Sequence, residues 1–444
     1  MINQHFENLR KILEGMSEDV TDVCKEALAS HGDTQGLSAV ERMVAPRGVP
    51  QGLTPGTPRN TPVVAPVTST WSPVDPWEGL AAPAAALTSA AAQPSVVTPE
   101  LLSSVLAVYG VTTTSSHVAT GPTVTTHVLG IPVGSRVSSV VSRESDLARD
   151  LGVDSVRIID RVPGHPGCIG VEMPNKTRVE VSFRSVLLDM PESEGSPVVA
   201  LGVNTLGRST WRKLSDLPHM LVAGASKSGK SIFLHSLVCS VVARHTPETV
   251  KLVLVDPKRV EFGEYAALPH MAIPVAHTAG DALAALDYLV AQLDVRKDML
   301  VGSGHRDIQA YHAAGGRGMP YVLAVIDEYS ALMMSGGKGT AKAVEEKILR
   351  LAQEARAFGI HLVLATQRPS ADVVTGAIKA NMQAKAVFRV SSAVDSRVVM
   401  DTNGAEGLRG NGDMLYSDDS GTVRIQGVMV DDSTRKAVCR GGTP

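Results

Sequence analysis

The residues best suited to do chemistry lie at 224–231, where the chain reads GASKSGKS. This run matches the pattern G-x-x-x-x-G-K-[ST], with an apolar strand pattern before it and an apolar helix pattern beginning at it. Gly224 and Gly229 let the backbone curl so that successive N–H groups face one anion, and a helix N-terminus adds partial positive charge. In such a loop Lys230 reaches the β- and γ-phosphates, and the Ser231 hydroxyl coordinates Mg²⁺. This context favours a nucleotide site over a chance glycine-rich turn, and the candidate binding residues are Gly224, Ala225, Ser226, Lys227, Ser228, Gly229, Lys230 and Ser231.

Two acids, Asp327 and Glu328, follow the apolar run YVLAVI. A carboxylate at the C-terminal end of a parallel strand lies at the same sheet edge as a phosphate loop. We therefore expect Asp327 to hold the Mg²⁺ ion, directly or through water. We expect Glu328 to be the general base that orients and polarises an attacking water. The alternative is a solvated pair of acids at a strand end, which six preceding apolar residues make less attractive.

Three further polar residues are candidates around the same phosphates. Gln367 and Arg368 follow the apolar run HLVLAT, and a polar side chain there can contact a γ-phosphate and report its loss. Arg356 lies on the preceding helix pattern, and an arginine can stabilise the charge on a phosphoryl group in transfer. The alternatives are a structural role for Gln367 and a surface ion pair for Arg356.

The elements that would position these residues alternate between strand and helix from about residue 197. The apolar runs HMLVAG, VKLVLVD, YVLAVIDE, HLVLATQ and AKAVFRVS are continuous, which is typical of strands buried on both faces. The sequence therefore predicts an α/β domain with a parallel sheet and helices on both faces. A strand between the phosphate loop and Asp327 favours a P-loop ATPase with a catalytic glutamate over a simple nucleotide kinase. Before this domain, mixed helix and strand patterns from residue 98 predict a small α+β domain.

Length and composition limit the remaining possibilities. The 444 residues allow two or three domains, and a net charge of −3 requires that any basic nucleic-acid surface be local. Four widely spaced cysteines without a Cys-x-x-Cys signal neither a zinc site nor a disulfide framework, so a reducing cytoplasm is the simplest setting. The sequence begins without a signal-peptide pattern, and no apolar run approaches the ~18 residues needed to span a bilayer. We therefore expect no membrane insertion.

Four segments follow from these patterns. Residues 1–45 begin with an amphipathic helix pattern that suits either a peripheral helix or a docking helix, so residues 1–97 could recruit a protein partner. Residues 46–97 are rich in Pro, Ala and Thr and are expected to form a disordered linker. The small α+β domain is assigned to residues 98–195 and the ATPase domain to 196–444.

Several stretches resemble one known family, the FtsK/SpoIIIE double-stranded DNA translocases, over about three quarters of the chain. The matching stretches are LVDPKRVEF, IDEYSALMM, ARAFGIHLVLATQRPSADVVTGAIKANM, VSSAVDSRVVMD and GAEGLRGNGDMLY, together with LARDLGVDSVRII and VPGHPGCIGVEMPNK in the small domain. The resemblance implies a hexameric ring, with a tier of α domains and a tier of RecA-like motor domains around duplex DNA. It also implies that ATP is bound between subunits and that Arg356 is offered to the neighbour's ATP. Gln367 matches the sensor, and Arg368 and Arg397 fall in stretches that approach DNA.

The chain also departs from the family's pattern. Lys227 stands where the phosphate loop usually has glycine, and Ala393 stands where a lysine is common. Neither a winged-helix domain nor a transmembrane anchor is expected, which suggests a shortened relative from a phage, plasmid or other mobile element. A motor for protein export and a nucleotide-binding scaffold without turnover are the alternatives to a DNA motor.

Overall fold

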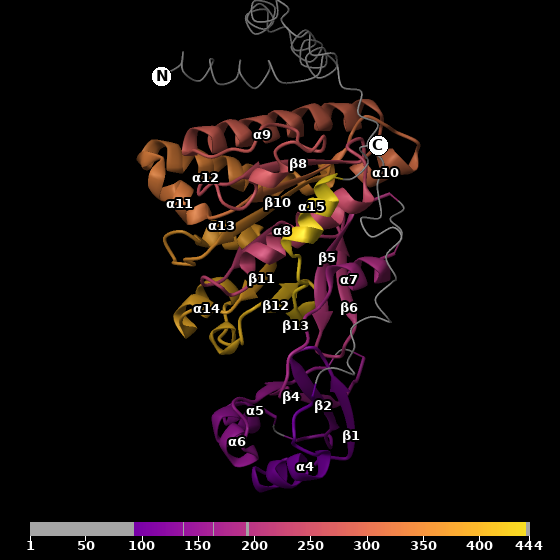
Figure 1. Ribbon diagram of the computed structural model, residues 1–444, viewed down its shortest axis with the longest axis vertical. Coiled ribbons are helices and arrows are strands. Elements are labelled where there is room, and N and C mark those ends of the chain that lie inside the picture. The colour runs from indigo at the N-terminus through magenta and orange to yellow at the C-terminus, as the bar shows by residue number, and fades with distance from the viewer. Residues whose placement is uncertain (1–92, 136, 163, 192–194, 441–444) are drawn as a thin grey trace, which may run out of the picture.

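The structure is a computed structural model that describes residues 93–135, 137–162, 164–191 and 195–440. Figure 1 shows two lobes, a small one at the bottom and a large one above it. The expected helical segment at 1–45, and nearly all of the expected linker at 46–97, lie outside the described residues.

The small lobe is an antiparallel four-stranded sheet, in the order β1-β2-β4-β3, with helices on one face. Its first helix, α4, begins behind Thr98, whose side chain accepts the Leu101 N–H, and Pro99 occupies the first helical position. Leu102 and Leu106 are four residues apart and point from α4 into the core. The elements of this lobe are α4 (Pro99–Val108), β1 (Ser115–Thr120), β2 (Val124–Gly130), α5 (Ser138–Val141), α6 (Glu144–Leu151), β3 (Arg157–Ile159) and β4 (Cys168–Pro174).

The next helix, α7 (Phe183–Asp189), differs from expectation. The sequence assigns it to the small domain, which is expected to span residues 98–195. In the structure its apolar residues Phe183, Val186 and Leu187 belong to a core of the large lobe. The reason is that α7 packs on β5 (Val198–Asn204), whose apolar face it covers.

The large lobe contains a mixed nine-stranded sheet in the order β6-β5-β13-β12-β11-β7-β10-β9-β8. The five predicted strands are present as β7 to β11, and they pair in parallel in the order β11-β7-β10-β9-β8. The antiparallel strands β5, β6, β12 and β13 extend this sheet on the β11 side. Besides β5, the strands are β6 (Ser209–Lys213), β7 (Met220–Ala223), β8 (Val250–Val255), β9 (Tyr321–Ile326), β10 (Ile360–Thr366), β11 (Ala384–Phe388), β12 (Asp413–Asp418) and β13 (Gly421–Gln426).

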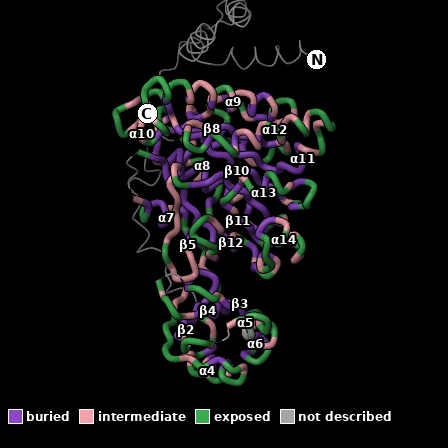
Figure 2. The backbone as a smooth tube through the Cα atoms, turned by 180° about the vertical axis from the view of Figure 1, so that it is seen from behind, coloured by how far each residue is buried: buried purple, intermediate pink, exposed green. Residues whose placement is uncertain are grey.

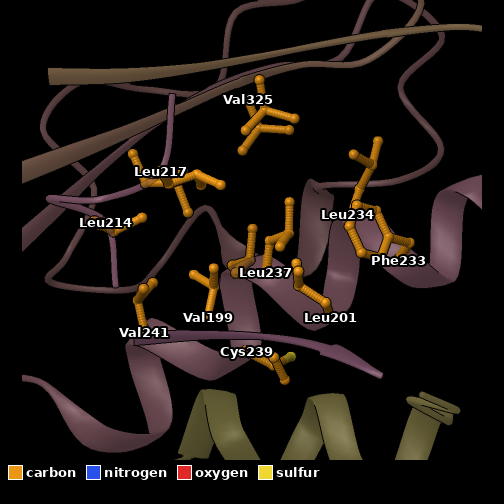
Figure 3. Close-up of a cluster of buried hydrophobic side chains, with 14 of the residues drawn as sticks. Val199, Leu201, Leu214, Leu217, Phe233, Leu234, Leu237, Cys239, Val241 and Val325 are labelled. Carbon is orange, nitrogen blue, oxygen red and sulfur yellow. The ribbon is translucent and has the colours of Figure 1, made fainter. Parts of the chain in front are cut away.

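Helices cover both faces of this sheet, which explains the continuous apolar strands. In β8, Leu252 and Leu254 enter the core beneath α8, whereas Val253 and Val255 enter the core beneath α9 and α12. Figure 3 shows part of the first core, and Figure 2 shows buried residues concentrated through the middle of the lobe. The helices are α8 (Lys230–Arg244), α9 (Ala279–Gly302), α10 (Ile308–Ala313), α11 (Tyr329–Ser335), α12 (Gly337–Glu354), α13 (Gly376–Asn381), α14 (Ala393–Met400) and α15 (Asp432–Arg440), with 3₁₀ turns η1 (Gly263–Tyr265), η2 (Arg356–Phe358) and η3 (Ala405–Gly407).

The parallel strands fix where the candidate residues lie. The carboxyl ends of β7, β9 and β10 share one edge of the sheet, so the segments that follow them are neighbours. Those segments carry the phosphate loop, the two acids and Gln367. Among the described residues, no helix is both long enough and apolar enough to cross a bilayer.

Candidate nucleotide site

The phosphate loop joins β7 to α8 in a conformation that requires its two glycines. Gly229 has a φ of 112°, and a Cβ atom there would lie 2.3 Å from the backbone nitrogen of Gly412. A Cβ at Gly224 would lie 2.7 Å from the Cβ of Phe388. Both distances are too short for any side chain, so packing requires glycine at both positions, and the positive φ also favours glycine at Gly229.

Backbone hydrogen bonds fix this loop to its surroundings. The N–H of Ala225 donates to the carbonyl of Arg389 (2.9 Å), and the N–H of Gly412 donates to the carbonyl of Ser228 (2.8 Å). Gly229 is the N-cap of α8 and has no side chain to accept the first-turn N–H groups. An anion at this helix end would satisfy those donors and lie at the positive end of the helix dipole.

Buried charges lie beside the loop. Lys230 and Asp327 form an ion pair in which both side chains are almost fully buried. Burial raises the pKa of Asp327, and the ammonium of Lys230 partly offsets that rise. The Ser231 hydroxyl donates to Glu261 (2.7 Å), and the hydrogen bond from His235 is the main reason that the pKa of Glu261 is lowered to about 2.

Glu328 has a strained backbone conformation, and both of its carboxylate oxygens accept hydrogen bonds. It has a left-handed φ of 57°, which is unusual for a residue with a side chain. Its Oε2 accepts from Lys258 Nζ (2.8 Å), and its Oε1 accepts from the Ser330 hydroxyl and from the N–H of Gln367. Burial alone would raise the pKa of Glu328, but these bonds, led by the one from Lys258, outweigh burial and lower it.

A cavity of about 740 Å³ opens over the phosphate loop, a volume typical of small-molecule sites. Gln367 lines this cavity beside the phosphate loop. The remaining walls come from other parts of the chain, some far away in sequence. Apart from Gln367 and the loop, the lining residues are Arg178, Val179, Glu180, Val181, Ile232, Phe233, Glu261, Phe388, Asn411, Gly412, Gln426, Gly427, Val428 and Met429.

Seven candidate residues do not line this cavity: Gly224, Ser228, Asp327, Glu328, Arg356, Arg368 and Arg397. Asp327 and Glu328 contact residues that do line it, Lys230 and Gln367. Arg356 precedes β10 whereas Gln367 follows it, so the seven residues of β10 separate them by roughly 20 Å. The exposed Arg356 side chain donates to the carbonyl of Asp216 (3.0 Å). Arg368 and Arg397 are exposed and line no part of the cavity, Arg397 lying on α14.

Sequence reasoning missed several residues of the site. Lys258 and Glu261 lie on one loop after β8, and Asp256 anchors that loop by accepting the N–H groups of Glu261 (3.0 Å) and Phe262 (3.1 Å). The signal was available, because Asp256 ends an apolar strand as Asp327 does. Asn411 and Gln426 gave no comparable local signal, since only tertiary packing brings them to the phosphate loop.

The oxygen donors beside Lys230 suit Mg²⁺. They are the Ser231 hydroxyl and the carboxylates of Glu261 and Asp327, and hard cations prefer such ligands. The described residues contain no group of three His, Cys, Asp or Glu that could hold a metal alone. Mg²⁺ in nucleotide sites usually takes one or two carboxylates and completes its shell with phosphates and water, so this sparse donor set fits.

Comparison with known proteins shows which family the sequence resembles. The model of the FtsK/SpoIIIE family matches residues 189–371, and the model of the FtsK alpha domain matches residues 79–175. The DNA translocase FtsK of Lactiplantibacillus plantarum is 40% identical over 344 residues, which is 74% of this chain and 43% of the relative. The DNA translocase FtsK of Chlamydia trachomatis is 36% identical over 356 residues, which is 76% of this chain and 44% of the relative. The chain thus spans less than half the length of these curated relatives.

Two solved structures share the fold. The pCW3 conjugation coupling protein TcpA, in its monomer form with ATPγS, has a TM-score of 0.52 at 24% identity, covering 74% of this chain and 93% of that one. The cytoplasmic domain of the Thermomonospora curvata type VII secretion ATPase EccC has a TM-score of 0.51 at 23% identity, covering 60% of this chain and 35% of that one.

Proposed function

The chain belongs to the FtsK/SpoIIIE family, and from that premise we propose that it is an ATP-hydrolysing motor that moves along double-stranded DNA. One observation carries the proposal most directly: the phosphate loop, Asp327 and Glu328 converge at one sheet edge. The name DNA translocase, carried by relatives with up to 40% identity, supports duplex DNA as the substrate of the movement.

The proposed reaction uses this chain's own groups as follows. The oxygen of water attacks the γ-phosphorus, the bond from that phosphorus to the β–γ bridging oxygen breaks, and Glu328 accepts the proton from water. The products are ADP and phosphate. Lys230 exchanges its partner Asp327 for a phosphate oxygen, which frees Asp327. Ser231 and the freed Asp327 would hold Mg²⁺, which when bound neutralises charge on the phosphates.

We propose that the nucleotide site is completed by a second copy of the chain in a ring, which the family resemblance implies is a hexamer. Arg356 lies at the opposite edge of the sheet from the cavity, so it cannot complete its own chain's site without unfolding β10. In a head-to-tail ring one subunit's amino edge faces the next subunit's carboxyl edge. Arg356 would then stabilise charge on the neighbour's transferred phosphoryl group.

Two other residues carry the proposed link from ATP to DNA. Gln367 borders the cavity, and Arg368 next to it is exposed. A shift of Gln367 on loss of the γ-phosphate would therefore move Arg368. Arg368 and Arg397 would contact DNA phosphates, which gives grip without sequence reading.

The decisive experiment measures ATP hydrolysis by the full chain with and without long duplex DNA at low salt. We expect duplex DNA to stimulate hydrolysis and added salt to remove the stimulation, because phosphate contacts weaken steeply with ionic strength. Glu328→Gln should lower turnover by roughly 10²–10⁴-fold while nucleotide still binds. Hydrolysis at full rate without any response to DNA would contradict a DNA motor, and unchanged turnover in the Glu328→Gln variant would remove Glu328 from its role.

A further inference from the structure

The ion pair between Lys258 and Glu328 joins two different loops of the site. Lys258 lies on the loop after β8, and Glu328 follows Asp327 directly after β9. Their charged atoms are 2.8 Å apart, and the Lys258 side chain is 42% exposed whereas that of Glu328 is 4% exposed. Lys258 is therefore the one member of the pair that can readily leave for solvent or another anion.

The other contacts of Glu328 show why this pair matters for chemistry. Its Oε1 already accepts from the Ser330 hydroxyl (2.5 Å), the N–H of Gln367 (3.1 Å) and the Thr366 hydroxyl (3.3 Å). Oε2 is the oxygen that remains for water, and it accepts from Lys258. A base must direct a free lone pair at the proton it takes, and Lys258 already takes one of the two lone pairs of Oε2.

The loop that presents Lys258 is fixed independently of this ion pair. Asp256 accepts two N–H groups of the loop, and Glu261 at its far end accepts the Ser231 hydroxyl. Arg259, next to Lys258, has a left-handed φ of 58°. The loop thus places Lys258 at Glu328 without help from the ion pair.

We propose that Lys258 is a positioning residue that restrains Glu328 while the motor is not engaged on DNA, and that it leaves Glu328 when hydrolysis begins. This inference deepens the proposed function and rests on it. The restraint lowers turnover by occupying the catalytic carboxylate, and it leaves the nucleotide cavity intact, since Lys258 does not line that cavity.

The test compares Lys258→Met with the matched Lys258→Arg in the full chain, measuring kcat and KM for ATP with and without duplex DNA. Methionine keeps an apolar stem of similar length and removes the charge. We expect Lys258→Met to raise the DNA-free kcat by roughly tenfold, which corresponds to about 1.4 kcal/mol, with KM unchanged within about twofold. With duplex DNA the kcat of Lys258→Met should stay near that of the unmodified chain. The ratio of kcat with DNA to kcat without DNA therefore falls. Lys258→Arg should keep the low DNA-free rate.

Adding Glu328→Gln to Lys258→Met should abolish the gain, because the gain must pass through Glu328. An unchanged or lower DNA-free kcat in Lys258→Met, or a change confined to KM, would overturn the restraint while the proposed function stands. Unchanged turnover in Glu328→Gln alone would instead remove the proposed base, and this inference would fall with it.

Discussion

Strained residues concentrate around the cavity. The described residues include five non-glycine positions with positive φ: Lys227, Arg259, Glu328, Asp401 and Asn411. Lys227 and Asn411 line the cavity, and Arg259 and Glu328 lie in the two loops joined by the Lys258 ion pair. Such conformations cost about 1–3 kcal/mol each and persist where surrounding structure imposes them. The backbone around the nucleotide is therefore held in place for binding.

Lys227 shows that the family's usual glycine has a physical reason. Its φ of 61° is a conformation that glycine adopts without cost, and its side chain is exposed. Lys227→Gly should remove strain of about 1–3 kcal/mol and add unfolded-state entropy worth about 0.5–1 kcal/mol. We expect a net gain of about 1 kcal/mol in the free energy of unfolding, measured by urea denaturation. Lys227→Ala is the control and should bring no gain; equal stabilities of the glycine and alanine variants would contradict the prediction.

Gly229 offers the opposite test, since here a side chain cannot fit. Gly229→Ala should abolish nucleotide binding, because its Cβ would displace Gly412 and with it the bond that Gly412 donates to Ser228. A fluorescent nucleotide titration measures the loss. The control is Gly376→Ala at the first position of α13, where a Cβ meets no atom within 4 Å. That variant should bind normally and gain up to about 1 kcal/mol of stability. Normal binding by Gly229→Ala would show that the loop can relax.

At the scale of elements, the sequence predicted the parts whose burial is locally periodic or continuous. The parallel strands β7 to β11 read as apolar runs because both of their faces are covered, and the phosphate loop, Asp327, Glu328 and Gln367 follow from where those strands end. The strand β6 could not be predicted in this way, because none of its residues is fully buried. The position of α7 and the cavity walls from Asn411 and Gln426 depend on contacts between distant segments, which no local pattern encodes.

One link between elements joins the two lobes. Arg424 on β13 donates to Asp413 on β12 (2.7 Å and 2.9 Å) and to Glu172 on β4 of the small lobe (3.2 Å), with all three side chains nearly buried. Removing Arg424 takes the ion-pair partner from the buried Asp413 and leaves Glu172 paired with Arg157. Arg424→Met should therefore cost about 3–5 kcal/mol in the free energy of unfolding, measured by urea denaturation.

A matched loss of charge at the surface provides the control. Lys342 pairs with Glu346 one turn along α12, and both side chains are largely exposed. Lys342→Met should cost no more than about 0.5 kcal/mol. If Arg424→Met were as mild as Lys342→Met, the buried network would not stabilise the junction of the lobes.

At the scale of the whole molecule, the parallel sheet has two functionally different edges. Its carboxyl edge holds the cavity, and its amino edge holds Arg356, whose side chain donates to the carbonyl of Asp216. Because β10 separates the edges by roughly 20 Å, a single chain carries both halves of the proposed site without joining them. Head-to-tail assembly would join them at every interface.

Mixing two inactive variants tests this arrangement. Arg356→Ala lacks the donated arginine but keeps Glu328, and Glu328→Gln keeps Arg356 but lacks the base. Each variant alone should hydrolyse ATP poorly in the presence of duplex DNA. In rings mixed at random from equal amounts, a site works when an Arg356→Ala subunit is completed by a Glu328→Gln neighbour, which holds for roughly one quarter of interfaces. Hydrolysis by the mixture should therefore rise well above the mean of the separate variants after subunit exchange.

A mixture of Glu328→Gln with Lys230→Ala, which both damage the same edge, should show no such rise because each lacks a residue of the same half-site. If the first mixture stayed as inactive as its components while exchange was shown by differently tagged subunits, Arg356 would not act across an interface.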